Sequence, residues 1–332
     1  MQSDIKILDN LLALNLNISL WTARRKLTPE DLGNADLPPE DLASLGSKRI
    51  ADPETLKVFT ALKSRAFSFL DKHGIRFMGG WAIPEDKAGI IVDELMKIRD
   101  EFTAAKDRFL AMYDDSLKTW LAKHAQWAGI IRTSVVSSDY VRSRFSFLWQ
   151  LFKVQPLMGH ENVNAMLNSG LAEEVTGLGN ELFSEVARDA NDIWQRVYLG
   201  KTEVTHKALS PLRTLQEKLR GLSFVEPHVA PVGEIIAEAL QRMPKRGKIT
   251  GTDLLLLQGL VCMLRDGDAL LTHAEAVLQG NATGNVLDAL LEGNQWGIAE
   301  DGWANAYSNT GDTLSPLPLA ANAVQIQSYG LW

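Results

Sequence analysis

The stretch that decides the fold runs from Pro84 to Arg132 and reads PEDKAGIIVDELMKIRDEFTAAKDRFLAMYDDSLKTWLAKHAQWAGIIR. Apolar or small residues recur in it at steps of three and four, which places them on one face of a helix. This stripe comprises Ile91, Leu95, Ile98, Phe102, Ala105, Phe109 and Met112, and then drifts through Tyr113 and Leu117 to Trp120, His124, Trp127 and Ile131. The pattern predicts one uninterrupted helix, roughly 70 Å long.

The predicted helix begins at Pro84, a residue that loses no hydrogen bond in a first helical turn. Glu85 and Asp86 follow it and interact favourably with the positive end of the helix dipole. A helix of this length has two interpretations. Either it packs against other helices of the same chain in an antiparallel bundle, or it forms a seam between subunits, because a coiled coil needs the same spacing.

A short β element is predicted before this helix. Residues 12–22 alternate, with Leu14, Leu16, Ile18 and Leu20 on one side and Asn15, Asn17 and Ser19 on the other. A period of two indicates a half-buried strand. We expect it to pair with the extended residues 75–83, because a lone strand leaves its backbone groups without partners. Residues 28–52 form a turn-rich connector between them.

Further apolar periodicity predicts a series of helices around the long one. They cover about residues 53–73, 137–154, 178–199, 203–219, 232–243, 250–279 and 285–292. Pro211 is expected to kink or break the fourth of these. The predicted fold class is mainly α. It is a long-helix hairpin or antiparallel helical bundle with a small two-stranded β element near the N-terminus and an irregular aromatic C-terminal tail.

This organisation divides the chain into four segments. They are a strand, connector and helix region in 1–83, a coiled-coil-like bundle in 84–226, a C-terminal helical region in 227–292 and an irregular docking tail in 293–332. The tail holds the aromatic residues Trp296, Trp303, Tyr307, Tyr329 and Trp332. Disordered tails normally have few aromatics, so we expect this one to dock, either on its own body or on a partner.

Charge is distributed unevenly along the chain. No lysine or arginine follows Arg265, although eight acidic residues do, whereas residues 1–265 carry 34 bases and 33 acids. This acidic end is either a well-solvated surface or a tail that docks on a basic surface of a partner or of a second copy.

Composition is that of a soluble globular protein, with 45% hydrophobic and 23% charged residues in a chain of 332. No apolar run is long enough for a membrane span, and the first residues lack the pattern of a secretory signal. The single cysteine, Cys262, fits a reducing compartment and lies in an apolar run typical of a buried thiol. We therefore expect a cytoplasmic protein that has no membrane partner.

Motifs for catalysis are missing from the sequence. It has no phosphate-binding Gly-x4-Gly-Lys-Ser/Thr loop, no His-Glu-x-x-His zinc motif and no Gly-x-Ser-x-Gly nucleophile elbow. The six histidines are scattered without the paired spacing of a metal site. These observations favour a protein that is not an enzyme and holds no cofactor.

Two groups of basic residues are candidate contacts for nucleic acid or for a protein partner. They are Lys245, Arg246 and Lys248 in a short loop, and Arg132, Arg142 and Arg144 around the turn after the long helix. Tyr140 lies in the second group, and smaller basic clusters occur at 24–26 and 48–49. A phosphate binder spreads positive charge over a whole face, whereas acids balance these bases, so ordinary solvated surface is the alternative.

Four strings of sequence resemble a particular family. They are Asn17-Ile-Ser-Leu-Trp-Thr-Ala-Arg-Arg-Lys-Leu, Asp36-Leu-Pro-Pro-Glu-Asp, Gly46-Ser-Lys-Arg-Ile and Phe77-Met-Gly-Gly-Trp-Ala-Ile-Pro. With the long helix, they resemble an uncharacterised domain family of bacterial mobile-element and phage proteins, often encoded near MoxR-like or cobaltochelatase-like AAA+ ATPases. The resemblance covers about residues 12–280 and includes no catalytic residue. It implies a cytoplasmic location, a horizontally transferred genetic context and an ATPase partner.

Two functional hypotheses follow from the sequence. The first is a non-enzymatic interaction or assembly protein, able to self-associate, that serves as partner or adaptor of an AAA+ ATPase system on a mobile element or phage. The alternative is a nucleic-acid-associated protein of conjugation or recombination.

Overall fold

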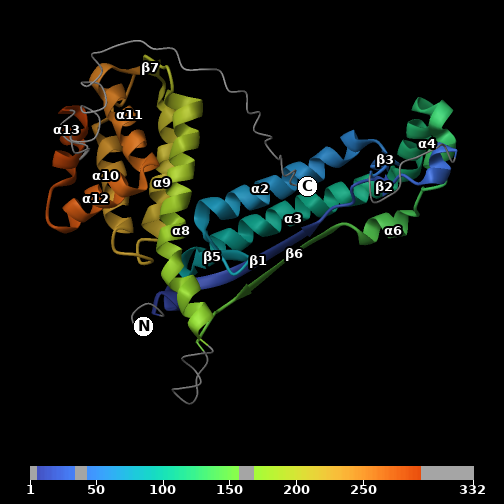
Figure 1. Cartoon of the computed structure of the whole chain (residues 1–332), viewed down its shortest axis with the longest axis horizontal. Coiled ribbons are helices and arrows are strands. Elements are labelled where there is room, and N and C mark those ends of the chain that lie inside the picture. Colours follow the sequence, from blue (N-terminus) through green and yellow to red (C-terminus); the bar gives the residue numbers. More distant parts are fainter. Residues whose placement is uncertain (1–5, 34–42, 157–167, 293–332) are drawn as a thin grey trace, which may run out of the picture. The chain divides into compact units, whose positions relative to one another are not determined.

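The computed structural model describes residues 6–33, 43–156 and 168–292, and most of these residues are helical, as predicted (Figure 1). Its largest sheet has four strands in the order β4-β5-β1-β6, and every pairing in it is antiparallel. The strands are β1 (Leu11–Ser19), β4 (Ile75–Phe77), β5 (Gly80–Pro84) and β6 (Ser146–Phe152). The predicted pairing of the N-terminal strand with residues 75–83 is therefore confirmed, but the element has four strands rather than two.

Strand β1 carries the predicted alternation. Its buried face is formed by Leu14, Leu16 and Ile18, and the residues between them, Asn15, Asn17 and Ser19, are exposed. β1 pairs along one edge with β5 and along the other with β6, so that Leu14 lies opposite both Trp81 and Leu151. The backbone of β1 is therefore hydrogen-bonded to a strand on each edge, whereas the sequence predicted only one partner strand.

The first hydrophobic cluster lies between this sheet and two helices, α2 (Lys57–His73) and α3 (Ala88–Ala111). Aromatic rings form its centre: Phe59 of α2 and Phe102 of α3 have ring centroids 5.3 Å apart, and the Phe145 ring lies 4.4 Å from that of Phe59. The part of the predicted stripe that α3 buries in this cluster comprises Ile91, Leu95, Ile98, Phe102 and Ala105.

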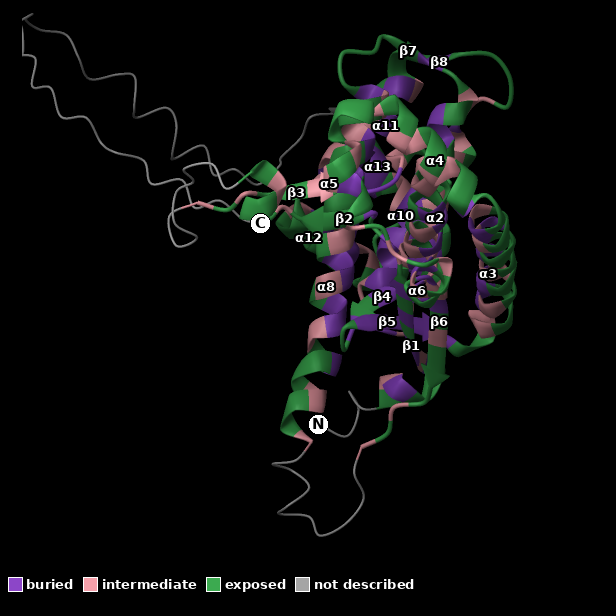
Figure 2. Cartoon of the chain, turned by 90° about the vertical axis from the view of Figure 1, so that its right-hand side faces the viewer, coloured by how far each residue is buried: buried purple, intermediate pink, exposed green. Residues whose placement is uncertain are grey.

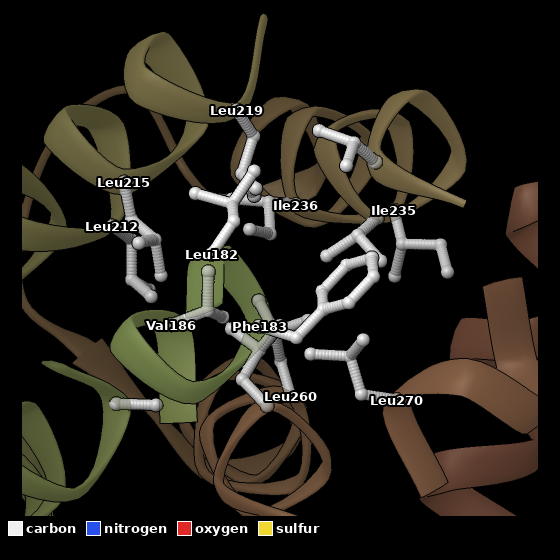
Figure 3. Packing of buried hydrophobic residues seen from close by; sticks show 14 of the residues in the cluster. Leu182, Phe183, Val186, Leu212, Leu215, Leu219, Ile235, Ile236, Leu260 and Leu270 are labelled. Carbon is white, nitrogen blue, oxygen red and sulfur yellow. The ribbon is translucent and has the colours of Figure 1, made fainter. Parts of the chain in front are cut away.

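The second hydrophobic cluster is a helical bundle that covers residues such as Leu11 and Ala13 of β1. Its helices are α8 (Ser169–Ile193), α9 (Ser210–Gly221), α10 (Val229–Arg242), α11 (Gly251–Arg265), α12 (Gly267–Leu278) and α13 (Thr283–Glu292). Figure 3 shows side chains from five of these helices meeting, among them Leu182, Leu215 and Ile236. A short pairing of β7 (Glu203–Val204) with β8 (Ile249–Thr250) lies at one end of the bundle.

The long helix predicted over 84–132 is not continuous. A single 3₁₀ turn, η4 (Glu85–Lys87), precedes α3, and the chain then breaks at Met112 before α4 (Tyr113–Lys123). A second break at His124 leads through η5 (Ala125–Trp127) to α5 (Ala128–Arg132). At the first break Tyr113 is buried, whereas Met112 is 67% exposed.

The helix predicted over 137–154 is also wrong. Ser137 caps a helix as expected, because its side chain accepts a hydrogen bond from the Tyr140 backbone, but that helix is only α6 (Ser138–Ser143). Strand β6 follows it. Its sequence, SFLWQLF, is rich in aromatic residues that favour strands, and the free edge of β1 offers a hydrogen-bonding partner along its length. Tertiary pairing has therefore overridden a weak helical period.

The remaining helices follow the sequence with shifted ends. Pro211 marks a break as predicted, because 3₁₀ turn η7 (His206–Leu209) gives way to α9 immediately before it. The helix predicted over 250–279 is two helices, since Asp266 ends α11 and its carboxylate accepts backbone hydrogen bonds at the start of α12.

The predicted boundary at 226/227 falls between α9 and α10, which pack together in the second cluster. The segment 84–226 contributes α3 to the first cluster and α8 and α9 to the second. The aromatic residues of the predicted docking tail, which begins at Gly293, lie outside the described residues. Within the described part of the chain, no helix is long and apolar enough to cross a membrane.

Candidate functional site

A two-stranded basic ribbon is the most strongly charged element of the described chain. It pairs β2 (Arg24–Lys26) with β3 (Ser47–Arg49), and we call it the basic ribbon. It lies at the same end of the described chain as α4 and α6, and its side chains are mostly exposed (Figures 1 and 2). The sequence identified these two clusters only as smaller basic groups, with ordinary surface as the alternative, and did not predict that they pair.

Two buried residues anchor the basic ribbon to the first cluster. Ala23 and Ile50 flank it and are almost fully buried, and the Ile50 N–H donates a hydrogen bond of 2.9 Å to the Ala23 carbonyl oxygen. Ala23 has a φ of 53°, which is costly for a residue that carries a Cβ. Strain of this kind persists only where the surrounding structure holds the backbone in place. The packing around Ala23 therefore fixes the direction in which the arginines of the ribbon point away from the protein.

The register divides the basic ribbon into two faces. Arg24 lies opposite Arg49, and Arg25 lies opposite Lys48. Since side chains on neighbouring positions of a strand point to opposite faces, the Arg24–Arg49 pair occupies one face and the Arg25–Lys48 pair the other. Like charges directly opposite each other are destabilising, so neither pair is explained by the stability of the ribbon alone.

The first face opens on a cleft of about 350 Å³. Arg24, Arg49 and Lys57 contribute three cations to its walls, and the hydroxyls of Thr22 and Thr60 lie among them. Its other lining residues are apolar: Leu20, Trp21, Pro53, Leu56 and Phe59. Among the residues that the structure describes, no carboxylate lines this cleft. We call it the arginine cleft, and its chemistry suits an anion.

The second face is partly neutralised. Lys48 forms an ion pair with Asp31, and both side chains are largely buried. The hydrogen bond from Lys48 is the main cause that holds the pKa of the Asp31 carboxyl below its usual value. Arg25 lies over the Tyr140 ring, 5.3 Å from its centroid. The cations of the second face are therefore engaged in contacts within the protein.

Helix α6 brings one predicted arginine to the basic ribbon. Arg144 donates a hydrogen bond of 2.9 Å to the Tyr140 hydroxyl and lies 4.9 Å from the centre of its ring. This hydrogen bond is the main cause that lowers the pKa of the Tyr140 hydroxyl. Because Arg25 contacts the same ring, Tyr140 joins the ribbon to α6.

Several arginines at this end have no acidic partner. Within the described part of the chain, none of Arg24, Arg25, Arg49, Arg132 and Arg142 forms an ion pair, and all five are exposed. Elsewhere an arginine such as Arg65 binds two carboxylates. The sequence group around Arg132 and Arg142 is thus part of a larger basic end that the basic ribbon completes.

The second predicted basic group lies elsewhere. Lys245, Arg246 and Lys248 belong to the connection between α10 and β8, at the end of the bundle marked by β7 (Figure 1). Lys248 forms an ion pair with Glu203 of β7. The structure therefore does not join this loop to the basic ribbon.

Among the residues that the structure describes, one charged side chain is buried, and it has hydrogen-bond partners. Lys218 of α9 is 4% exposed, and its ammonium donates hydrogen bonds to Glu185 of α8 at 2.5 Å and to the Asp71 carbonyl of α2 at 2.6 Å. The Asp71 carboxylate accepts further hydrogen bonds from Arg76 and from the Trp81 indole, each of 2.8 Å. We call this group the lysine junction, because it links the two hydrophobic clusters.

The lysine junction has the contacts of a structural element. Every polar atom named in it has a partner, which is what burial of a charge requires. The nearby Asp189 carboxyl has a pKa raised by burial. Within the described residues, no group of three histidine, cysteine or acidic side chains is placed to hold a metal ion.

These features define a class: a mainly helical protein with a four-stranded antiparallel sheet and, in the described part of the chain, an exposed basic end. The chain belongs to the family described as a protein of unknown function (DUF3150), whose model matches residues 8–266. That match includes the basic ribbon, α6 and the lysine junction. No curated protein and no solved structure matches the chain.

Proposed function

We propose that this protein is a non-enzymatic, nucleic-acid-associated protein whose basic end binds phosphates. The observation that carries the proposal is the arginine cleft, where Arg24 and Arg49 have no ion pair within the described residues and the third cation, Lys57, pairs with Glu54 at 2.6 Å. Guanidinium groups bind phosphate oxygens through two parallel hydrogen bonds, and hydroxyls add further donors. Arg132 and Arg142, which form no ion pair within the described part of the chain, extend the positive charge beyond the cleft.

The two faces of the basic ribbon distinguish this proposal from non-specific attraction. On the first face Arg24 and Arg49 form no ion pair within the described residues, whereas on the second face Lys48 is paired with Asp31. A polyanion in contact with the ribbon would therefore gain more from the first face. General attraction by surface charge would depend on the number of charges and not on the face that carries them.

Fluorescence anisotropy with labelled DNA and RNA oligonucleotides at low salt tests the proposal. The double variant Arg24→Gln with Arg49→Gln should weaken binding about tenfold or more, since each lost phosphate contact costs on the order of 1 kcal/mol. The matched control is Arg188→Gln with Arg196→Gln, which removes the same charge from exposed positions on or next to α8. Absence of binding by the wild type at micromolar concentration, or equal losses in both variants, would contradict the proposal.

A second candidate function is favoured by the exposed edge of the sheet. β6 is an edge strand, and its outward residues include Leu148, 64% exposed, and Phe152, 45% exposed. Apolar residues on an unpaired edge are a common basis for protein association. Together with the resemblance noted above, this supports an adaptor or assembly subunit of an AAA+ ATPase on a mobile element or phage, in the cytoplasm.

Capture experiments with such an ATPase, with and without ATP, test this second candidate. The variant Leu148→Lys should abolish capture, because a charge on the free edge opposes strand pairing. Leu199→Lys, at a comparably exposed position (51%) outside the sheet, is the matched control. No capture of the wild-type chain at micromolar concentration would remove the support for this candidate.

A further inference from the structure

The break between α3 and α4 opens a groove next to the basic ribbon. The groove has a volume of about 560 Å³ and lies between the start of α2 and the α3–α4 junction. Met112, the residue at the break, is 67% exposed and forms part of its wall. We call it the Met112 groove.

Both apolar and polar residues line the Met112 groove. Its apolar lining residues are Val58, Ala105, Phe109, Met112 and Trp120, and its polar ones are Asp52, Thr55, Arg108, Asp115, Ser116, Thr119 and Lys123. The His124 ring contacts the Trp120 indole, with centroids 4.3 Å apart and an angle of 60° between the ring planes. Carboxylates, hydroxyls and cations around an apolar slot can hydrogen-bond the edge of a flat heterocycle.

A direct contact joins this groove to the basic ribbon. The Trp120 indole N–H donates a hydrogen bond of 3.4 Å to the carbonyl oxygen of Arg49, the last residue of β3. Asp52 and Thr55 line the Met112 groove, and Pro53 and Leu56 of the same 3₁₀ turn, η3 (Pro53–Leu56), line the arginine cleft. The two depressions are therefore neighbours on opposite sides of one short segment.

We infer that the Met112 groove takes an unpaired nucleobase, and that the ligand of the basic end is single-stranded nucleic acid. The inference rests on the proposed function, because the phosphates of the strand would bind the arginine cleft. An unpaired base has an apolar face for Met112 and Trp120 and a hydrogen-bonding edge for the rim. A base inside a duplex has both faces stacked and cannot enter the groove without leaving its partner.

The test compares strands that carry the same phosphates with and without bases. Anisotropy is measured with a 15-nucleotide oligothymidylate, with an abasic strand of the same length, and with a 15-base-pair duplex. Stacking of a base on protein side chains is worth about 1–3 kcal/mol, so the wild type should bind the intact strand about fivefold to a hundredfold more tightly than the abasic strand. We expect Met112→Gln to bring this ratio close to one.

Met96→Gln is the matched control, since Met96 is an exposed methionine on α3 that does not line the groove. It should leave the ratio between intact and abasic strands unchanged. Both substitutions are neutral, so a change of ratio cannot come from a change of protein charge.

The outcomes separate this inference from the proposed function. Equal affinity of the wild type for intact and abasic strands, with weaker binding of both by the Arg24→Gln, Arg49→Gln variant, would overturn the base site and leave the phosphate site standing. An unchanged ratio of intact-strand to abasic-strand affinity in Met112→Gln would also overturn the base site. An apolar peptide would then be the alternative ligand of the groove. No binding of any strand would overturn both.

Discussion

The lysine junction and the basic end use charge in opposite ways. At the junction, Lys218 is almost fully buried and bound to Glu185 and to the Asp71 carbonyl. At the basic end, Arg24 and Arg49 are exposed, face each other across a ribbon and have no ion pair within the described residues. The first arrangement satisfies its charges inside the protein, whereas the second leaves them for a ligand.

This difference separates residues that maintain the fold from residues that are free to bind. Breaking a buried ion pair leaves an unpaired charge in the interior and lowers the free energy of unfolding by about 3–5 kcal/mol. Removing an exposed arginine that has no ion pair leaves no buried charge behind and lowers the free energy of unfolding by about 0.5 kcal/mol or less. Substitutions at the two regions should therefore alter different measured quantities, stability in one and affinity in the other.

The largest effect on stability is expected in the aromatic centre beneath the basic end. Phe102 is buried among Phe59, Phe145 and Phe147, so Phe102→Asp should destabilise the protein by about 4 kcal/mol or more. Urea unfolding measures this loss, with Ile90→Asp at an exposed position as control. A melting temperature unaffected by Phe102→Asp would show that the stripe does not form the core.

Lys218→Ala should lower the free energy of unfolding by about 3–5 kcal/mol, because Glu185 would remain buried without its cation. Replacing both partners, as Lys218→Met with Glu185→Met, should cost less than the single change. Arg188→Ala, which breaks an exposed pair with Glu181, is expected to cost about 0.5 kcal/mol or less. Equal costs for the buried and exposed pairs would break the comparison between the two regions.

The stability contributed by a third charged group, centred on His228, should depend on pH. The His228 imidazole bridges Glu226 at 2.5 Å and Glu275 at 2.8 Å, and the hydrogen bond with Glu226 is the main cause that raises its pKa above 6.5. A raised folded-state pKa contributes stability that is full below pH 6.5 and is lost as pH rises through the folded pKa. Hydrogen bonding from His228 lowers the pKa of Glu275, so that carboxylate loses its contribution only as pH falls below 4.5.

The stability difference between the wild type and His228→Gln should therefore be largest near about pH 6 and shrink in alkaline solution. Thermal unfolding across the pH range measures it. A difference that stays constant from about pH 6 to pH 9 would show that the bridge does not depend on the charge of His228.

The smallest effect is expected at the loop of Lys245, Arg246 and Lys248, one of the two basic groups named from the sequence. Lys245→Gln with Arg246→Gln should change oligonucleotide affinity less than about twofold, because this loop lies apart from the basic ribbon and Lys248 beside it is held by Glu203. A loss as large as that of the Arg24→Gln, Arg49→Gln variant would move the binding site to the bundle.

Local periodicity predicted most of the fold. The alternation of β1, the stripe of α3 and the helices of the second cluster depend on spacings of two or of three and four, which are visible in the sequence. Strand β6 was not predicted, because its residues fit a weak helical period. Its strand conformation depends on pairing with the free edge of β1, which lies more than 120 residues earlier in the chain. The breaks at Met112 and His124 were not predicted either, because the apolar spacing continues across both.

The candidate site was predicted only in part. Arg132, Arg142 and Arg144 were named from their place after the long helix, and the structure brings Arg144 to Tyr140 and Arg25. The pairing of β2 with β3 was missed, because two short basic clusters separated by a turn-rich connector carry little β signal. Gly46, with a φ of 76°, and the buried residues Ala23 and Ile50 are the features that could have indicated a ribbon.

The salt dependence of binding tests the central claim most directly. The logarithm of the affinity of the wild type for oligothymidylate should fall linearly with the logarithm of salt concentration. In the Arg24→Gln, Arg49→Gln variant the slope should be smaller by about 1.4, the value for two lost phosphate contacts on a single strand, with the melting temperature unchanged. An unchanged slope, or a loss of affinity that accompanies a loss of stability, would contradict the assignment of phosphate binding to the basic ribbon.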